Sequence, residues 1–373
     1  MRSRLVLFTP GPVQIPQMVA EYLADPPCNY HRQEGFRTMF RTTQADLKSL
    51  LGIREPRAWS AAVLTTTGTG ANEACLLALS GSGRGLIVEN GFFAARLVAQ
   101  ASACGVEHVR LALPDDRPID PAAVDVALAA DPGLRWVYFV SHETRMGLAN
   151  PTTQIGRAAA RHRVLVAADV VSHAFAYPLD LEAARIDLAV TSSAKALMGV
   201  PGLGIVFTRL AAVSRLGSSP RSYYLDLRAE LEAQRRSHQP RFAQPVALHA
   251  ALHAACKHLR CIGIEAHMRR IRSQMDELVL HLESLGVPAQ LDPAHRSWVA
   301  VNFRLPAGLA YPAFAAQMEA EGYYLLYGIP GDHGHFQLST LGDLEPQQVV
   351  GLKEALTRVL CGAEAHRAVA VGG

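Results

Sequence analysis

The feature that most constrains the fold is an alternation of short apolar runs with helical stretches over the first two thirds of the chain. The runs lie at positions 86–89, 136–140, 164–168, 188–191 and 204–207. Helical stretches such as 151–162 lie between them. This order is typical of parallel strands connected by helices. We therefore predict an α/β fold with a mostly parallel central sheet covered by helices on both faces.

The pattern changes after about residue 245. Apolar residues recur at spacings of three and four in a helix that ends near Gly286. Strand candidates follow at 298–303, 323–327 and 335–339, before a helix at about 346–360. A chain of 373 residues exceeds the usual size of a single core. We predict a large domain of residues 16–245 and a small α+β C-terminal domain of residues 246–373, which includes the N-terminal segment 1–15.

The composition favours a globular enzyme with small-molecule substrates and indicates no nucleic-acid or membrane partner. Apolar residues make up 49% of the chain and charged residues 18%, with a net charge of +3 in dispersed positions. No run reaches the roughly 18 apolar residues of a membrane helix. The six cysteines include no Cys-x-x-Cys pair, which favours reduced thiols in a cytoplasmic protein. No metal site is expected.

Lys195 stands alone in a stretch of small and apolar residues, between a strand-like run and a Gly-Val-Pro-Gly turn at 199–202. Lysine is seldom buried without a counter-charge or a covalent partner. Desolvation lowers the pKa of the amine and makes it a nucleophile, which is how a lysine holds pyridoxal phosphate as a Schiff base. Taken by itself, the segment fits better a lysine that reaches from a strand end into water.

Asp169 directly follows the apolar run 164–168, as ligand-facing carboxylates at strand ends of open α/β sheets often do. A carboxylate beside a pyridine nitrogen keeps that ring protonated, and the protonated ring is the electron sink that stabilises a substrate carbanion. The alternative is an ordinary helix N-cap, because aspartate is a favoured capping residue. The residue alone does not decide between the two.

A Thr- and Gly-rich turn at 65–70 joins a short strand at 61–64 to a helix that continues through Leu79. Its hydroxyls, its backbone N–H groups and the helix N-terminus would converge on one point, which predicts a phosphate site. No Gly-Lys-Ser/Thr follows and the Rossmann glycine spacing is missing, so it is neither a P-loop nor a dinucleotide fingerprint. Such a turn without a ligand is also common.

Turn, carboxylate and lysine, in this order, resemble the fold-type I, class V pyridoxal-phosphate enzymes, in the branch of 2-aminoethylphosphonate:pyruvate and alanine:glyoxylate (serine:pyruvate) aminotransferases. The resemblance spans nearly the whole chain, with motifs at 7–12, 30–32, 90–96, 142–151, 222–227 and 341–343. It implies the type I transferase fold and pyridoxal 5'-phosphate bound to Lys195, with Asp169 as the second catalytic residue. It also implies a homodimer with active sites at the subunit interface.

The resemblance implies further roles by position. The matching residues are Thr67, Gly68, Thr69 and Ser193 for the phosphate, Phe93 and Val171 for the two faces of the ring, and Thr144 for the ring substituents. Gly11 lies in a Pro-Gly-Pro segment that relatives place beside the substrate. Phe93 as a core residue and Gly11 as a plain turn glycine remain the alternatives.

Two departures from the family pattern concern the substrate and the partner subunit. Relatives anchor the substrate carboxylate with an arginine where this chain has Gln337, which carries no charge. Arg145 or the histidines of the loop 331–335 could supply a substrate cation, although solvent-exposed loops are the simpler interpretation of both. Relatives touch the partner's phosphate with a threonine at the position of Ala243, and this contact could pass to Gln244 or Arg241.

We therefore predict an aminotransferase that moves an amino group between a small amine or amino acid and an oxo-acid, with atypical recognition of the substrate carboxylate. The alternative that keeps the cofactor is a lyase, a β- or γ-replacement enzyme or a carbon–carbon bond-forming enzyme of a biosynthetic pathway. A non-catalytic regulator would need a DNA-binding or partner module, and the sequence indicates none.

Overall fold

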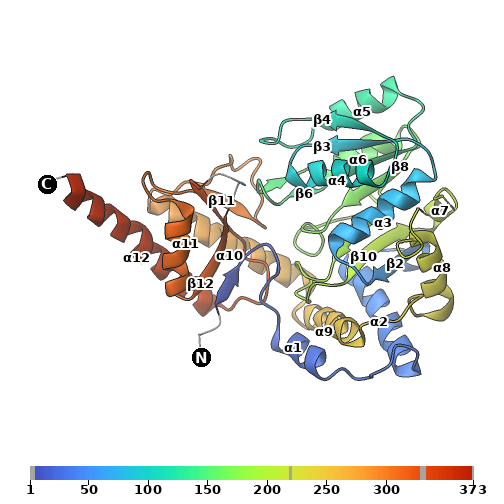
Figure 1. The fold of residues 1–373 in the computed structure, drawn as a ribbon, viewed down its shortest axis with the longest axis horizontal. Coiled ribbons are helices and arrows are strands. Elements are labelled where there is room, and N and C mark those ends of the chain that lie inside the picture. Colours follow the sequence, from blue (N-terminus) through green and yellow to red (C-terminus); the bar gives the residue numbers. More distant parts are fainter. Residues whose placement is uncertain (1–4, 218–220, 328–332, 372–373) are drawn as a thin grey trace.

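The computed structural model describes residues 5–217, 221–327 and 333–371, with side chains as far as residue 362. Figure 1 shows a large sheet with its helices on one side of the molecule and a smaller sheet with three helices on the other. The N-terminal segment runs between the two parts. Among the described residues, no helix is long and apolar enough to span a membrane.

The large sheet has the strand order β2-β10-β9-β8-β5-β3-β4. Its strands are β2 (Trp59–Leu64), β3 (Gly85–Glu89), β4 (His108–Ala112), β5 (Trp136–Val140), β8 (Leu165–Asp169), β9 (Leu188–Ser192) and β10 (Gly204–Arg209). All neighbouring pairs are parallel except those that involve β10. The predicted mostly parallel sheet is thus confirmed. Because β5, β8 and β9 are parallel, their carboxyl ends lie at one edge of the sheet.

Helices cover both faces of this sheet, as the strand sequences require. Alternate side chains of one strand enter different cores: Leu86 and Val88 lie in one, Ile87 in the other. One face is covered by α2 (Glu34–Leu50), α5 (Pro121–Ala130), α6 (Thr152–Ala160) and α9 (Val246–Ile262). The other is covered by α3 (Gly68–Ser80), α4 (Phe92–Ala103) and α8 (Leu227–Ser237). Short elements are η1 (Pro56–Ala58), α7 (Leu210–Val213) and the hairpin of β6 (His142–Glu143) and β7 (Leu148–Ala149).

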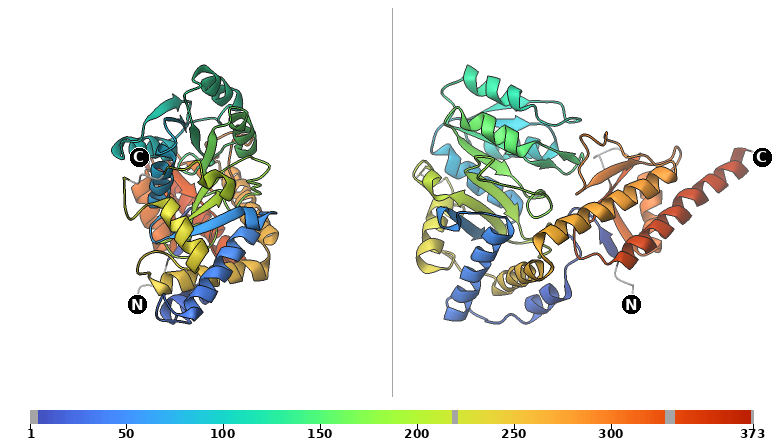
Figure 2. Two further views of the ribbon diagram at one scale, coloured as in Figure 1. Left: turned by 90° about the vertical axis from the view of Figure 1, so that its right-hand side faces the viewer. Right: turned by 180° about the vertical axis from the view of Figure 1, so that it is seen from behind.

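The smaller sheet has the order β1-β12-β13-β11 and its own core. Its strands are β1 (Val6–Phe8), β11 (Val301–Arg304), β12 (Tyr323–Tyr327) and β13 (His335–Leu338), and its helices are α10 (Ile264–Ser284), α11 (Tyr311–Ala320) and α12 (Pro346–Val371). The first strand of the chain, β1, pairs in parallel with β12. Helix α9 packs on α1 (Gln17–Ala24) and α2, and α10 continues from it to the smaller sheet (Figure 2).

Element ends differ from the predicted ones for local reasons. The helix predicted at 151–162 ends at Ala160, and Arg163 then adopts a left-handed conformation with φ of 57°. The strand predicted at 298–303 begins only at Val301. The Ser297 hydroxyl accepts hydrogen bonds from the N–H groups of Val299 and Ala300, at 2.8 and 3.3 Å, and holds that stretch in a turn.

Candidate active site

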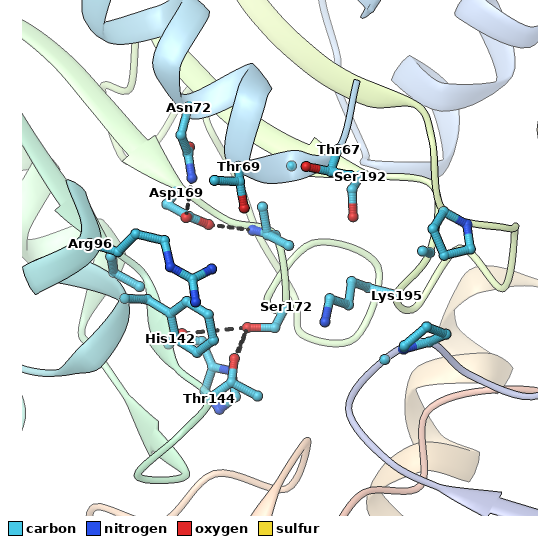
Figure 3. A pocket seen from close by; sticks show the side chains of 18 of the residues that line it. Thr67, Thr69, Asn72, Arg96, His142, Thr144, Asp169, Ser172, Ser192 and Lys195 are labelled. Carbon is cyan, nitrogen blue, oxygen red and sulfur yellow. Dashed lines mark hydrogen bonds between the residues drawn. The ribbon is translucent and has the colours of Figure 1, made fainter. Parts of the chain in front are cut away.

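A cavity of about 280 Å³ lies at the carboxyl edge of the large sheet (Figure 3), and Gly11 and Pro12 of the N-terminal segment are among the residues that line it. Its walls come from the start of α3, the first turns of α4, the ends of β5 and β8, and the loop between β9 and β10. The volume lies near the lower end of pockets that hold small molecules, roughly 300 to 1,000 Å³. Segments far apart in the sequence therefore meet around one small space.

Lys195 follows β9 and points its amine into this cavity (Figure 3). Gly11 packs directly against it: a Cβ at that position would lie 2.6 Å from Nζ, and its φ of +133° also favours glycine. Burial lowers the pKa of the Lys195 amine to about 8, although the carboxylate of Asp169 works in the opposite direction. Near pH 8 a large share of this amine is neutral and nucleophilic.

Asp169 is the last residue of β8 and is 7% exposed. Its carboxylate accepts hydrogen bonds from Asn72 Nδ2 at 2.6 Å and from the Val171 N–H at 2.9 Å. The Tyr138 hydroxyl donates to Asn72 Oδ1 at 2.7 Å and so fixes the amide. Burial raises the pKa of Asp169, while these hydrogen bonds and Lys195 lower it. The carboxylate is thus held in one orientation at the cavity wall.

The predicted phosphate site is formed by the first turn of α3. Thr67 is its N-cap residue, and Thr67, Gly68 and Thr69 all line the cavity. A Cβ on Gly68 would lie 3.0 Å from Val171 Cγ2, so the helix start and the β8 end are in close contact. The free N–H groups of a helix N-terminus favour an anion at this position.

Ser192, and not Ser193, lines the cavity beside this helix start. The Ser193 hydroxyl donates to the carbonyls of Val200 and Leu203 and stabilises the loop that carries Lys195. The register of β9 could have indicated Ser192. Its side chain has the same parity as Leu188 and Val190, which lie in the core on the α3 face of the sheet.

Phe93 and Val171 both line the cavity. The Glu143 carboxylate accepts from the N–H groups of Phe93 and Ala94, at 3.0 and 2.7 Å, and so caps the start of α4. Burial raises the pKa of Glu143 to about 7. The guanidinium of Arg96 lies over the Phe93 ring, 4.9 Å from its centroid. The position of Phe93 therefore depends on a buried carboxylate 50 residues further along the chain.

Thr144 also lines the cavity, and its hydroxyl lies 2.5 Å from that of Ser172. Sequence reasoning missed several polar residues that the fold brings to these walls: Asn72, Arg96, His142, Ser172 and Ser192. Apart from the parity of Ser192, no local pattern marks these residues, which stand on helices, on strands or, for Ser172, in the turn after β8. Only the tertiary arrangement collects them.

The residues considered for the substrate lie in different places. Gly11 is in the cavity wall, whereas Gln337 is 1% exposed and does not line it. The Gln337 amide donates to the carbonyls of Thr144 and Arg145, at 2.8 and 3.2 Å, and to Asn302 Oδ1 at 2.9 Å. It thus ties β13 of the smaller sheet to the loop after β6.

The Arg145 guanidinium stacks between two partly exposed rings, 4.9 Å from the centroid of Phe92 and 4.8 Å from that of Tyr327. This position joins the start of α4 to β12 of the smaller sheet. His333 and His335 line a separate surface cavity of the smaller domain together with Arg304. Gly331 and Asp332, from the same predicted loop, lie outside the described residues.

Gln244 does not line the cavity of its own chain. Its amide oxygen accepts from the Thr65 hydroxyl at 2.6 Å and lies 2.9 Å from His249 Nε2. Its amide nitrogen donates to the Phe242 carbonyl at 3.1 Å. A cross-subunit contact of Gln244 therefore stays a prediction. The described residues hold no cluster of three or more His, Cys, Asp or Glu that could bind a metal.

These groups fit pyridoxal phosphate as the bound group. A nucleophilic amine, a buried carboxylate and the free N-terminus of a helix face one cavity, and an aromatic ring and a valine line it as well. Such an arrangement is that of a pyridoxal-phosphate-dependent enzyme of fold type I.

The comparisons with known proteins identify the family. Residues 7–314 match the family Aminotransferase class-V, and the chain belongs to it. The 2-aminoethylphosphonate–pyruvate transaminases of Burkholderia mallei and Burkholderia pseudomallei are 32% identical to this chain over 356 residues, which cover 94% of it and 95% of each relative.

Solved structures agree. An aspartate aminotransferase of subgroup IV from Thermus thermophilus superposes with a TM-score of 0.85 at 28% identity, covering 95% of this chain and 98% of its own. An alanine–glyoxylate aminotransferase from Nostoc sp. has a TM-score of 0.88 at 22% identity, with 96% of both chains covered. The protein is a pyridoxal-phosphate-dependent aminotransferase with small-molecule substrates.

Proposed function

We propose that this aminotransferase moves the amino group of a small amine that carries an acid group to an oxo-acid, in two half-reactions in one cavity. The observation that carries the proposal is the juxtaposition of the Lys195 amine, the Asp169 carboxylate and the start of α3 around about 280 Å³. The relatives at 32% identity are named for 2-aminoethylphosphonate and pyruvate, both small acids. A cavity of this size favours substrates of that kind.

We assign a separate role in this reaction to each group of residues that lines the cavity. Lys195 would hold pyridoxal phosphate, which would supply the electron sink for the bond changes at the substrate carbon. Asp169 would hold a proton on the ring nitrogen, and the Lys195 amine would take up and return the proton of the substrate carbon. Thr67, Thr69 and Ser192 would hold the phosphate at the start of α3.

The acid group of the substrate needs a cation that Gln337 does not provide. Its amide nitrogen is already committed to the Thr144 and Arg145 carbonyls and to Asn302. We assign the role to Arg145, whose guanidinium is held over Phe92 next to the start of α4. Arg145 lines a second cavity at the start of α4 and not the cavity of Lys195. A planar guanidinium is nevertheless the side chain best suited to bind carboxylate or phosphonate through two parallel hydrogen bonds.

The proposed working form is a cytoplasmic homodimer. Tyr223 and Tyr224 are 77% and 49% exposed, and the Tyr224 ring stacks on that of Phe242 at 5.3 Å. Exposed aromatic residues grouped in this way mark an interaction surface. They lie in and beside the segment that carries Gln244, the residue proposed to reach the partner's site. Sedimentation at micromolar concentration should give a dimer, and a monomer alone would contradict this part of the proposal.

The test of the function is a donor screen without any acceptor. The cofactor-loaded protein is mixed in turn with 2-aminoethylphosphonate, alanine, serine and aspartate, and loss of the absorbance band of the lysine-bound cofactor is recorded. A donor should convert the cofactor stoichiometrically to pyridoxamine phosphate, detected by chromatography. Consumption of an amine without pyridoxamine phosphate would instead favour a lyase or replacement reaction.

A further inference from the structure

Three buried side chains beside the cavity form a connected set of hydrogen bonds. His142 Nδ1 lies 2.8 Å from Ser172 Oγ and 3.3 Å from Thr144 Oγ1. Ser172 Oγ lies 2.5 Å from Thr144 Oγ1 (Figure 3). The three residues are 1%, 5% and 5% exposed, and all of them line the cavity. Water therefore has little access to these hydrogen bonds.

The surroundings of His142 decide which atoms donate and which accept in this set of hydrogen bonds. Burial lowers the pKa of His142 to about 3, so the imidazole is neutral and carries a single proton. Its Nε2 is buried and has no hydrogen-bond partner among the described residues. A proton on Nε2 would be a buried donor without an acceptor, whereas a proton on Nδ1 finds two hydroxyl oxygens within 3.3 Å.

With the proton on Nδ1, the shortest contacts select one arrangement of the two hydroxyls. Ser172 Oγ accepts from His142 and donates its own hydrogen to Thr144 Oγ1 at 2.5 Å, a much shorter contact than that to its other acceptor, the His142 carbonyl at 3.4 Å. The hydrogen of the Thr144 hydroxyl then has no role inside the chain and points into the cavity. Each donor in such a series polarises the next one and strengthens it.

We propose that His142 and Ser172 are positioning residues that make the Thr144 hydroxyl a hydrogen-bond donor to an anionic oxygen on the cofactor ring. The inference rests on the proposed function, because it needs the cofactor ring in this cavity. A donor to that oxygen draws negative charge away from the protonated nitrogen that joins Lys195 to the cofactor. The pKa of that nitrogen is then lower than it would be without the hydrogen bonds of His142 and Ser172.

Other titratable groups face His142 and must be separated from it. Lys195 and His173 both act on its ionisation, and the Tyr177 ring lies 6.1 Å from its ring. His173 provides a matched control. It is also buried, its Nδ1 lies 2.6 Å from the Ser141 hydroxyl and its Nε2 has no partner among the described residues, but it does not line the cavity.

The experiment is a pH titration of the visible absorbance of the cofactor-loaded protein. Ser172→Ala and His142→Leu should each raise the midpoint pH by about 0.5 to 1, which corresponds to the loss of one ordinary hydrogen bond. His142→Asn places an amide N–H near the position of Nδ1 and should restore the wild-type midpoint. His173→Asn should leave it unchanged. Thermal unfolding of the cofactor-free variants shows whether each is folded.

Nitrogen NMR of ¹⁵N-histidine-labelled wild-type protein gives an independent readout, with the His142 signal assigned by its loss in His142→Asn. The proton should lie on Nδ1. A proton on Nε2, or an unchanged midpoint in Ser172→Ala, overturns the inference and leaves the proposed function standing. Retention of the absorbance band in Lys195→Ala would instead overturn the proposed function itself.

Discussion

The two ends of the cavity are built in different ways. At the cofactor end, the polar groups find their partners within the large domain: Asp169 is fixed by Asn72, which is fixed by Tyr138. At the outer end, Gln337 from the smaller sheet lies behind the cavity lining and is tied to the carbonyls of Thr144, which lines the cavity, and of Arg145. The cofactor end thus depends on one sheet edge, and the outer end on contacts between the smaller sheet and the loop after β6. We therefore expect a replacement at the outer end to leave the cofactor end undisturbed.

The largest expected effect on the difference between the two ends comes from replacing the Lys195 amine at the cofactor end. Lys195→Ala should abolish the absorbance band of the bound cofactor and reduce turnover by more than about a thousandfold, because both the covalent bond and the proton carrier are lost. Lys257→Ala, on the exposed side of α9, should change neither. Turnover within tenfold of wild type would remove Lys195 from the mechanism.

Asp169→Asn tests the carboxylate with almost no change of shape. An amide cannot hold a proton on the ring nitrogen by charge, so turnover should fall roughly a hundredfold while the cofactor stays bound. The measurements are kcat and the cofactor content after gel filtration. Asp116→Asn, which removes an exposed carboxylate paired with Arg117, serves as the control. Equal turnover of the two variants would contradict the role of Asp169.

The contrast also explains how far the sequence could predict the molecule. Strand alternation predicted most of the large sheet because its inner strands, such as β5 and β8, are buried on both faces, whereas the edge strand β4 is not. Thr67, Asp169 and Lys195 could be selected because they stand at the ends of such elements, and parallel strands bring those ends together. The family resemblance depends on the same residues. In the structure these three residues line one cavity because the backbone topology brings the element ends together.

Side-chain partners were less predictable. Ser192 and Ser193 are neighbours, and only the register of β9 shows which of them lines the cavity. The amide of Gln337 binds backbone carbonyls almost two hundred residues away, and every residue has a carbonyl, so no sequence pattern reveals that partner. His142 lines the cavity and finds its hydrogen-bond partner, Ser172, after a different strand, 30 residues along the chain.

Gln337→Glu sharpens the contrast at the outer end. A carboxylate there would face the carbonyl oxygens of Thr144 and Arg145 and the Oδ1 of Asn302, with no N–H to donate. We expect a loss of about 2 kcal/mol of unfolding free energy near neutral pH, or roughly thirtyfold in the unfolding equilibrium. Urea titration measures it. Gln317→Glu, at an exposed position of α11, should change the free energy of unfolding only slightly. An equal loss in both variants would show that the Gln337 hydrogen bonds do not stabilise the fold.

Arg145→Ala addresses the substrate directly. The KM for an acidic amino donor should rise about tenfold, with kcat within about twofold, since a charge-assisted contact present in ground and transition states alike is removed. Arg145→Lys should recover part of the affinity. Arg117→Ala, the control at an exposed arginine, should leave the KM unchanged. An unchanged KM for every acidic donor would show that another group binds the acid.

The smallest expected effect is on the stability of the cofactor-free protein, and it also concerns Lys195. The folded pKa of about 8 lies below the unfolded value of about 10.4, so the folded state binds fewer protons between these limits. Wild-type stability therefore gains from this group as the pH rises from about 8 to about 10, and below pH 8 the desolvated charge is a constant cost. Lys195→Met should raise Tm by a few degrees or less near pH 7, and this advantage should shrink toward pH 10. An advantage independent of pH would mean that packing, and not the buried charge, separates the two proteins.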